Sequence, residues 1–149
     1  MPRSTFTWKM FCDDGIEFEY PSNARAYSYA ISAASREYFI EPKGQKELPT
    51  LGQILLIYSD EGSFLRSIEY RMIPEDLEAV GATVLSHSKE PNLTDVCYEI
   101  HQPNGYTWLR LQKVGACWLH INILGAGRFA DFESIWQRVV GSIKVKTQK

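Results

Sequence analysis

The stretch TDVCYEIHQPNGYTWLRLQKVGACWLHINI, residues 94–123, decides the fold of this chain. It holds three runs in which apolar and polar residues alternate, at 94–100, 106–112 and 116–123. Alternation with a period of two predicts β-strands that are buried on one face. Turn residues separate the runs, so the pattern predicts a three-stranded antiparallel meander.

The first turn of this meander is predicted at the Asn104-Gly105 pair. A two-residue type I′ turn needs positive φ at both positions, and Asn-Gly adopts it most readily. With this turn, Glu99 lies opposite Arg110 and His101 lies opposite Trp108. The pairing therefore predicts an ion pair beside an aromatic ring.

The second turn is predicted at residues 113–115, where a glycine suits the left-handed position of a three-residue loop. This loop places Arg110 opposite Trp118 and Trp108 opposite His120. It also puts Cys97 and Cys117 on opposite faces of the sheet.

The predicted meander has two faces of different character. The apolar face is expected to be core and holds Val96, Tyr98, Ile100, Leu109, Leu111, Cys117, Leu119, Ile121 and Ile123. The other face holds a candidate binding surface made of Glu99, His101, Trp108, Arg110, Trp118 and His120. Trp and Arg are enriched at interface hot spots, which favours protein binding. The competing interpretation is a sheet face half-covered by a helix, with Arg110 stacked on Trp118.

Catalysis is the weaker interpretation of that face. Glu99, His101 and His120 are of the types that perform acid–base chemistry. The sequence offers no nucleophile placed with a base and a third, orienting group. It also contains no HxH or CxxC spacing, so too few ligands converge for zinc. We therefore expect no enzymatic activity, no metal and no cofactor.

The rest of the chain adds more strands and two helical regions. Residues 15–21, 36–40 and 53–59 read as strands, whereas residues 22–50 as a whole give no clear pattern. Residues 63–81 read as a central helix that Pro74 interrupts. An amphipathic C-terminal helix begins near Asp131, a plausible N-cap. We expect an α+β fold in one domain, 1–149, with an antiparallel sheet of about six strands.

Composition excludes several classes of protein. The chain has 149 residues, of which 44% are hydrophobic and 23% charged, as in an ordinary globular domain. It lacks the run of roughly 20 apolar residues that a membrane-spanning helix needs. Its N-terminus shows no signal peptide, so we expect a cytoplasmic location. The three cysteines fit reduced thiols better than a disulfide framework.

Charge is distributed unevenly along the chain. Residues 1–100 contain 9 basic and 16 acidic side chains, and residues 101–149 contain 7 basic and 2 acidic ones. A chain without a basic cluster is a poor candidate for nucleic-acid binding. The basic tail at 144–149 is expected to be the solvated end of the last helix.

The glycine-rich segment 125–130 matches the pattern GxGxxA of dinucleotide-binding proteins. That fingerprint opens a βαβ unit with an acidic residue about 20 positions later. No Asp or Glu follows Glu133, so nucleotide binding is not expected. A weak anion site at Gly125, Gly127 and Arg128, next to a helix N-terminus, stays open.

Five segments occur in this order along the chain: EFEYPS at 17–22, DLEAVGATVLSHS at 76–88, DVCYEI at 95–100, TWLRLQKVGACWLHINILGAGRF at 107–129, and FESIWQRVVGSIKV at 132–145. This order resembles that of PsbP-like (Mog/PsbP) proteins. The resemblance implies an α/β/α sandwich around an antiparallel sheet. Members of that fold are mostly adaptors: photosystem extrinsic subunits, a Ran-binding import factor and bacterial chaperones for secretion effectors. No functional residue of the family maps onto this chain.

The sequence as a whole favours a non-enzymatic protein-binding module that is adaptor or chaperone-like. By analogy with the family that it resembles, we expect this module in a bacterial cytoplasm. We expect a protein partner, with no nucleic-acid or membrane binding. Homodimerisation through an edge strand or the candidate surface is a further alternative. The main alternative is a protein that binds a small molecule or an anion in a pocket near Gly125–Arg128, His101 and His120, and this alternative includes an enzyme.

Overall fold

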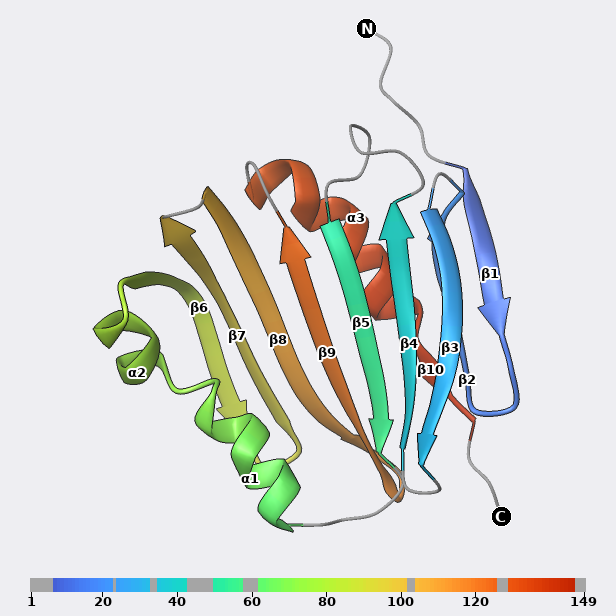
Figure 1. Cartoon of the computed structure of the whole chain (residues 1–149), viewed down its shortest axis with the longest axis horizontal. Coiled ribbons are helices and arrows are strands. Elements are labelled where there is room, and N and C mark those ends of the chain that lie inside the picture. Colours follow the sequence, from blue (N-terminus) through green and yellow to red (C-terminus); the bar gives the residue numbers. More distant parts are fainter. Residues whose placement is uncertain are drawn as a thin grey trace, which may run out of the picture.

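The computed structural model describes residues 7–22, 24–32, 35–42, 50–57, 62–101, 104–125 and 129–146. Its centre is a seven-stranded sheet in the order β3-β4-β5-β9-β8-β7-β6, and every neighbouring pair is antiparallel. Helices lie on both faces of this sheet (Figure 1). The predicted α/β/α arrangement of an α+β fold is therefore confirmed.

The large sheet contains β3 (Ala24–Ser32), β4 (Ser35–Pro42), β5 (Thr50–Ile57), β6 (Ala82–Glu90), β7 (Leu93–His101), β8 (Asn104–Val114) and β9 (Cys117–Gly125). A smaller, three-stranded sheet contains β1 (Trp8–Cys12), β2 (Ile16–Pro21) and β10 (Lys144–Val145). The helices are α1 (Gly62–Tyr70), α2 (Pro74–Ala79) and α3 (Phe129–Ser142). The large sheet thus has seven strands where about six were predicted, and the strand predicted at 36–40 lies within β4.

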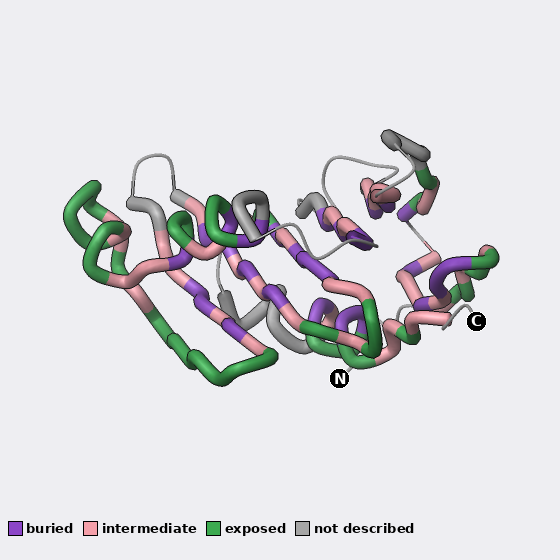
Figure 2. The backbone as a smooth tube through the Cα atoms, turned by 90° about the horizontal axis from the view of Figure 1, so that it is seen from below, coloured by how far each residue is buried: buried purple, intermediate pink, exposed green. Residues whose placement is uncertain are grey.

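Two hydrophobic cores lie on opposite faces of the large sheet. On the face that we call the α3 face, α3 and the small sheet pack over the central strands, with Phe18, Ile40, Ile54, Ile121 and Trp136 among the buried residues. On the other, which we call the α1 face, α1 packs over one end of the sheet, with Ile57, Ile68, Met72, Val96 and Leu111 among the buried residues. Figure 2 shows buried stretches along the middle strands and exposed ones at the sheet's outer edge.

The small sheet is joined to the large one by a turn around Asp13. The Asp13 carboxylate accepts hydrogen bonds from the backbone N–H groups of Gly15 and Ile16, at 2.8 and 2.9 Å. It also accepts one from Arg36 of β4 at 3.1 Å. Residues 144–145 pair with β2, so the predicted helical end of the tail is wrong there.

The central helical region is interrupted at Pro74, as predicted. α1 ends at Tyr70, and α2 restarts with Pro74 as its first residue because proline has no N–H to donate to a preceding turn. Gly81 has a positive φ of 95° directly after α2, a conformation that glycine adopts without strain. α3 begins at Phe129, so the prediction of Asp131 as N-cap is wrong. Among the described helices, none is long and apolar enough to cross a membrane.

The first predicted turn is misplaced, and the register of β7 against β8 differs from the prediction by four residues. β7 pairs with β8 so that His101 lies opposite Asn104, and Asn104 and Gly105 both belong to β8. Glu99 therefore lies opposite Tyr106, and Arg110 opposite Asp95. Because the shift is an even number of residues, each side chain keeps its predicted face.

The register predicted for β8 against β9 is wrong by three residues, an odd number, which has a larger consequence. Val114 pairs with Cys117, so the loop contains two residues, and its Gly115 has a φ of 62°. Trp118 lies opposite Lys113, and His120 lies opposite Leu111. An odd shift moves every side chain of β9 to the other face. Cys97 and Cys117 therefore share the α3 face, contrary to the prediction.

Candidate functional site

The predicted binding surface is divided between the two faces of the sheet. Trp108 and Arg110 share the α3 face because they lie two residues apart on β8. Glu99 shares it because it lies opposite Tyr106, which is two residues before Trp108. Trp118 and His120 point to the α1 face. The six residues therefore do not form one continuous surface.

A groove on the α3 face contains Trp108 and Arg110 of this group, and Glu99 does not line it. It has a volume of about 290 Å³ and lies between α3 and the strands β6, β7 and β8. Its lining consists of Ser86, Asp95, Cys97, Trp108, Arg110, Gln137, Val140 and Gly141. α3 covers the middle of this face, so the groove forms where the helix leaves the last strands of the sheet uncovered (Figure 1).

Three side chains at the floor of the groove hold one another in place. The indole N–H of Trp108 donates a hydrogen bond to Oδ1 of Asp95. Arg110 Nη2 lies 3.2 Å from Oδ2 of the same carboxylate. The Arg110 guanidinium also lies over the Trp108 ring, 5.3 Å from its centroid, within the range of a cation–π contact.

The cluster is partly shielded from water. The side chains of Arg110 and Asp95 are each 23% exposed, so solvent screens their attraction less than at an open surface. Arg110 Nε is buried, and no acceptor among the described residues reaches it. A buried donor without an acceptor is costly, which makes it a point where a ligand's oxygen would be favourable.

His120 lies in a second, smaller pocket on the α1 face. This pocket has a volume of about 150 Å³ and is lined by Ile68, Arg71, Tyr98, Thr107, Leu109, His120, Asn122 and Leu124. His120 Nδ1 lies 3.0 Å from the backbone carbonyl of Arg110 and donates to it. Burial, assisted by the charge of Arg71, lowers the pKa of His120 to about 4. The imidazole is therefore neutral at physiological pH.

Trp118 belongs to neither pocket. It packs against the core under α1, and its ring contacts Lys113, whose Nζ lies 5.9 Å from the ring centroid. The predicted stacking of Arg110 on Trp118 is wrong, because the two side chains lie on opposite faces.

The predicted anion site is described only in part. Gly127 and Arg128 lie outside the described residues, as does the side chain of His101. Gly125 ends β9 opposite Tyr106. A Cβ atom at Gly125 would lie 2.5 Å from the Tyr106 ring, so packing alone explains why this position is a glycine. In the described part of the chain, no three His, Cys, Asp or Glu side chains gather as metal ligands do.

Asp95 is the residue of the groove that the sequence reasoning missed. The predicted turn paired Arg110 with Glu99, and the observed register pairs it with Asp95. The alternation already put Asp95 on the same face as Glu99. Choosing between the two carboxylates required the register of β7 against β8, and the predicted register was wrong by four residues.

Comparisons with known proteins give structural neighbours only. No family model and no curated protein matches the sequence. The solution structure of cyanobacterial PsbP (CyanoP) from Synechocystis sp. PCC 6803 matches with a TM-score of 0.52 and 14% identity, over 95% of this chain and 94% of that one. A mutant of protein Mog1 matches with a TM-score of 0.52 and 11% identity, over 97% of each chain. The chain therefore has the fold of PsbP and Mog1, as the order of its sequence elements predicted.

Proposed function

We propose that this protein is a non-enzymatic protein-binding module, adaptor or chaperone-like, that holds its partner in the groove between α3 and the strands β6–β8. The observation that supports the proposal is the cluster of Trp108, Arg110 and Asp95 at the floor of the groove. Trp and Arg dominate binding hot spots, and this pair is fixed in position before any partner arrives.

The chemistry of the groove supports binding over catalysis. Both oxygens of Asp95 are already engaged, one by Trp108 and the other by Arg110. The carboxylate therefore maintains the shape of the site, and it is poorly placed to take a proton from a substrate.

The cytoplasm is the compartment that we propose for this module. Cys12, Cys97 and Cys117 are all free thiols in the structure. Thiols of this kind persist in reducing compartments and are uncommon in exported proteins.

The change Arg110→Gln is expected to abolish capture of the partner without unfolding the protein. It removes the charge and the ring contact but keeps most of the volume of the side chain. Loss of a hot-spot arginine typically costs 2 kcal/mol or more of binding, about a thirtyfold loss of affinity. The measurement is affinity capture from the source cells, with quantitative mass spectrometry of proteins that co-purify in stoichiometric amounts.

Arg138→Gln is the matched control for that experiment. Arg138 also pairs with a carboxylate, Glu19 at 3.2 Å, and lies over a tryptophan ring, Trp8 at 4.2 Å. Arg138 belongs to α3, contacts the small sheet through Glu19 and Trp8, and does not line the groove. The same partner should be captured by wild type and Arg138→Gln. Equal capture by Arg110→Gln would contradict the proposal.

Anion binding on the α1 face is a second candidate function. The observation that favours it is the pocket in which the cationic side chain of Arg71 lies beside Asn122 and His120. Inorganic phosphate is then expected to raise the melting temperature of the protein by a few degrees, and Arg71→Gln should remove the effect. An equal shift in both proteins would show that phosphate acts through general salt effects.

A further inference from the structure

We infer that the outer edge of β6 binds an extended, basic segment of the partner as an eighth strand, with its cationic side chains on the α3 face. This inference rests on the proposed function, because it states which backbone conformation and charge the partner of the groove has. Four observations on β6 and its surroundings support it.

The first observation is the free edge itself. β6 is the last strand of the seven-stranded sheet, and no described strand pairs with its outer side. The strand is nine residues long, and every residue from Leu85 to Glu90 is exposed. Figure 1 shows it at the margin of the sheet, with α2 beside its start. Such an edge presents a row of unpaired N–H and C=O groups, which an extended segment can satisfy by β-augmentation.

The second observation is that the edge and the groove are continuous. Ser86 of β6 lines the groove together with Cys97, its partner on β7. A strand added beside β6 would therefore place alternate side chains over Ser86 and Ser88, at the rim of the groove. Strands are about 4.8 Å apart, so a long side chain on the added strand spans β6 and reaches the side chains of β7.

The third observation is the charge on the α3 face of this edge. Glu90 and Glu99 lie on that face, on β6 and β7, together with Asp95. Arg110 neutralises Asp95, but neither glutamate forms an ion pair with a residue that the structure describes. The basic residue of β6, Lys89, lies opposite Thr94 and so points to the α1 face. Cationic side chains are thus favoured on one face of the added strand only.

The fourth observation is a β-bulge between Val84 and Ser86. A bulge increases the local twist and re-aims side chains, so the added strand is expected to pair with the regular part of β6, from Ser86 to Glu90. Val84 contacts the core under α1, and Leu85 is 42% exposed. Uncharged, branched residues on the α1 face of the added strand would cover this apolar surface. The expected ligand therefore alternates cationic with apolar residues.

The test uses a synthetic octapeptide that alternates lysine and valine, with the full-length protein at low ionic strength. Binding is measured by fluorescence anisotropy, and the contact is located by hydrogen exchange. We expect slower exchange of the amides at 85–90 when the peptide is bound. A peptide of the same composition with its lysines in one block should bind at least tenfold more weakly, because it cannot present them on one face.

Paired charge reversals separate the edge from general attraction to an acidic protein. Glu90→Lys with Glu99→Lys is expected to weaken peptide binding by tenfold or more. Glu17→Lys with Glu37→Lys changes the net charge equally, but Glu17 lies on β2 of the small sheet, and Glu37 lies on β4, near the edge of the large sheet opposite β6. This control should change the affinity by less than threefold.

Three results would overturn the inference. One is the absence of protection at 85–90, and another is an equal loss of affinity in both reversal variants. The third is a dimer that protects β6 without peptide, which would assign the edge to a second copy of the chain. Arg110→Gln tests the groove proposal separately. If Arg110→Gln loses the partner while the variant with Glu90→Lys and Glu99→Lys binds normally, the inference fails and the proposed function stands.

Discussion

Replacing Trp136 by alanine is expected to lower the free energy of unfolding by about 3–5 kcal/mol. Trp136 is 1% exposed and lies at the centre of the α3-face core, against the β4, β5 and β9 strands. Truncation removes the largest fully buried side chain of the protein and leaves a cavity that an extended sheet cannot close. Urea unfolding followed by circular dichroism measures the loss.

Gly52 provides the control for this prediction. A Cβ atom at this position would lie 2.5 Å from Cζ3 of Trp136, so Gly52→Ala alone is expected to cost about 1–3 kcal/mol through overpacking. In the Trp136→Ala background the added methyl has room, and the two costs should not add. Additive costs, or a loss below about 1 kcal/mol for Trp136→Ala, would mean that α3 does not pack on the sheet in this way.

The features that the sequence predicted are those that depend on local periodicity. Ile16 and Phe18 alternate with glutamates and are fully buried. Trp136, Val139 and Val140 follow the helical period and are buried on the side of α3 that packs on the sheet. A period of 2 or 3.6 is set by the backbone of the element itself, so neighbouring residues suffice to detect it.

Registers were harder to predict because they depend on loop length, which one residue can change. Glycine at 115 suits both a three-residue loop and the two-residue turn that the structure shows. The difference decides whether His120 shares a face with Trp108. Burial could not discriminate between the two pairings, because both faces of the large sheet are covered and both accept apolar side chains.

Some strands were missed for a related reason. β6 carries the sequence ATVLSHSKE, and its pattern is interrupted by the bulge after Val84 and by exposure of the remaining residues. An edge strand with little burial shows weak alternation. The exposure and the bulge that characterise β6 as an edge strand thus also weaken its alternation. The sequence therefore predicted a surface on the strands of the meander and did not include β6.

Acidification is expected to destabilise the protein by about 3 kcal/mol through His120 alone, mostly between pH 6.5 and pH 4. Burial lowers the pKa of His120 from 6.5 to about 4 in the folded protein. Below pH 6.5 the unfolded chain binds a proton at this position while the folded protein does not. The unfolded state therefore gains stability as the pH falls, and the contribution is fully present only above pH 6.5.

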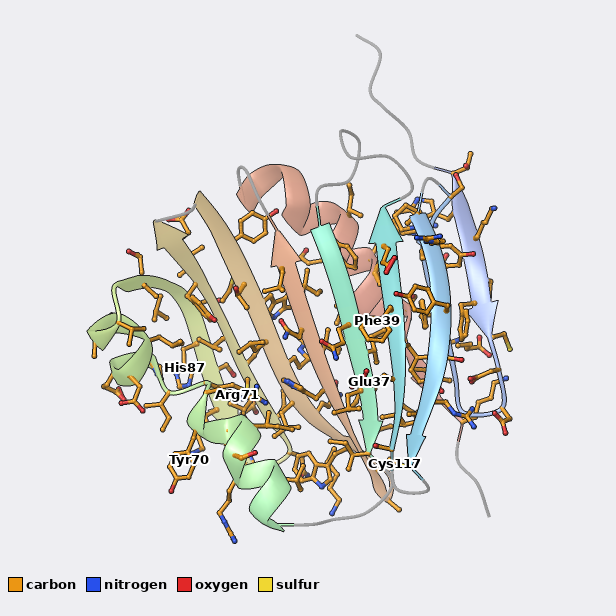
Figure 3. The ribbon with its side chains drawn as sticks, in the orientation of Figure 1. Glu37, Phe39, Tyr70, Arg71, His87 and Cys117 are labelled. Carbon is orange, nitrogen blue, oxygen red and sulfur yellow. The ribbon has the colours of Figure 1, made fainter. Side chains whose placement is uncertain are left out.

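The slope of stability against pH isolates this effect from the simple loss of packing. His120→Gln removes the titrating group, so its curve should be flatter than that of wild type between pH 4 and 6.5 whatever its absolute stability. His87→Gln is the matched control, because it makes the same substitution at a histidine that is exposed on β6 (Figure 3). Chemical denaturation at half-unit pH intervals gives the three curves. Parallel curves for wild type and His120→Gln would place a charged, solvated imidazole at this position. That result would also show that the pocket around His120 is open to water, contrary to the burial that lowers its pKa.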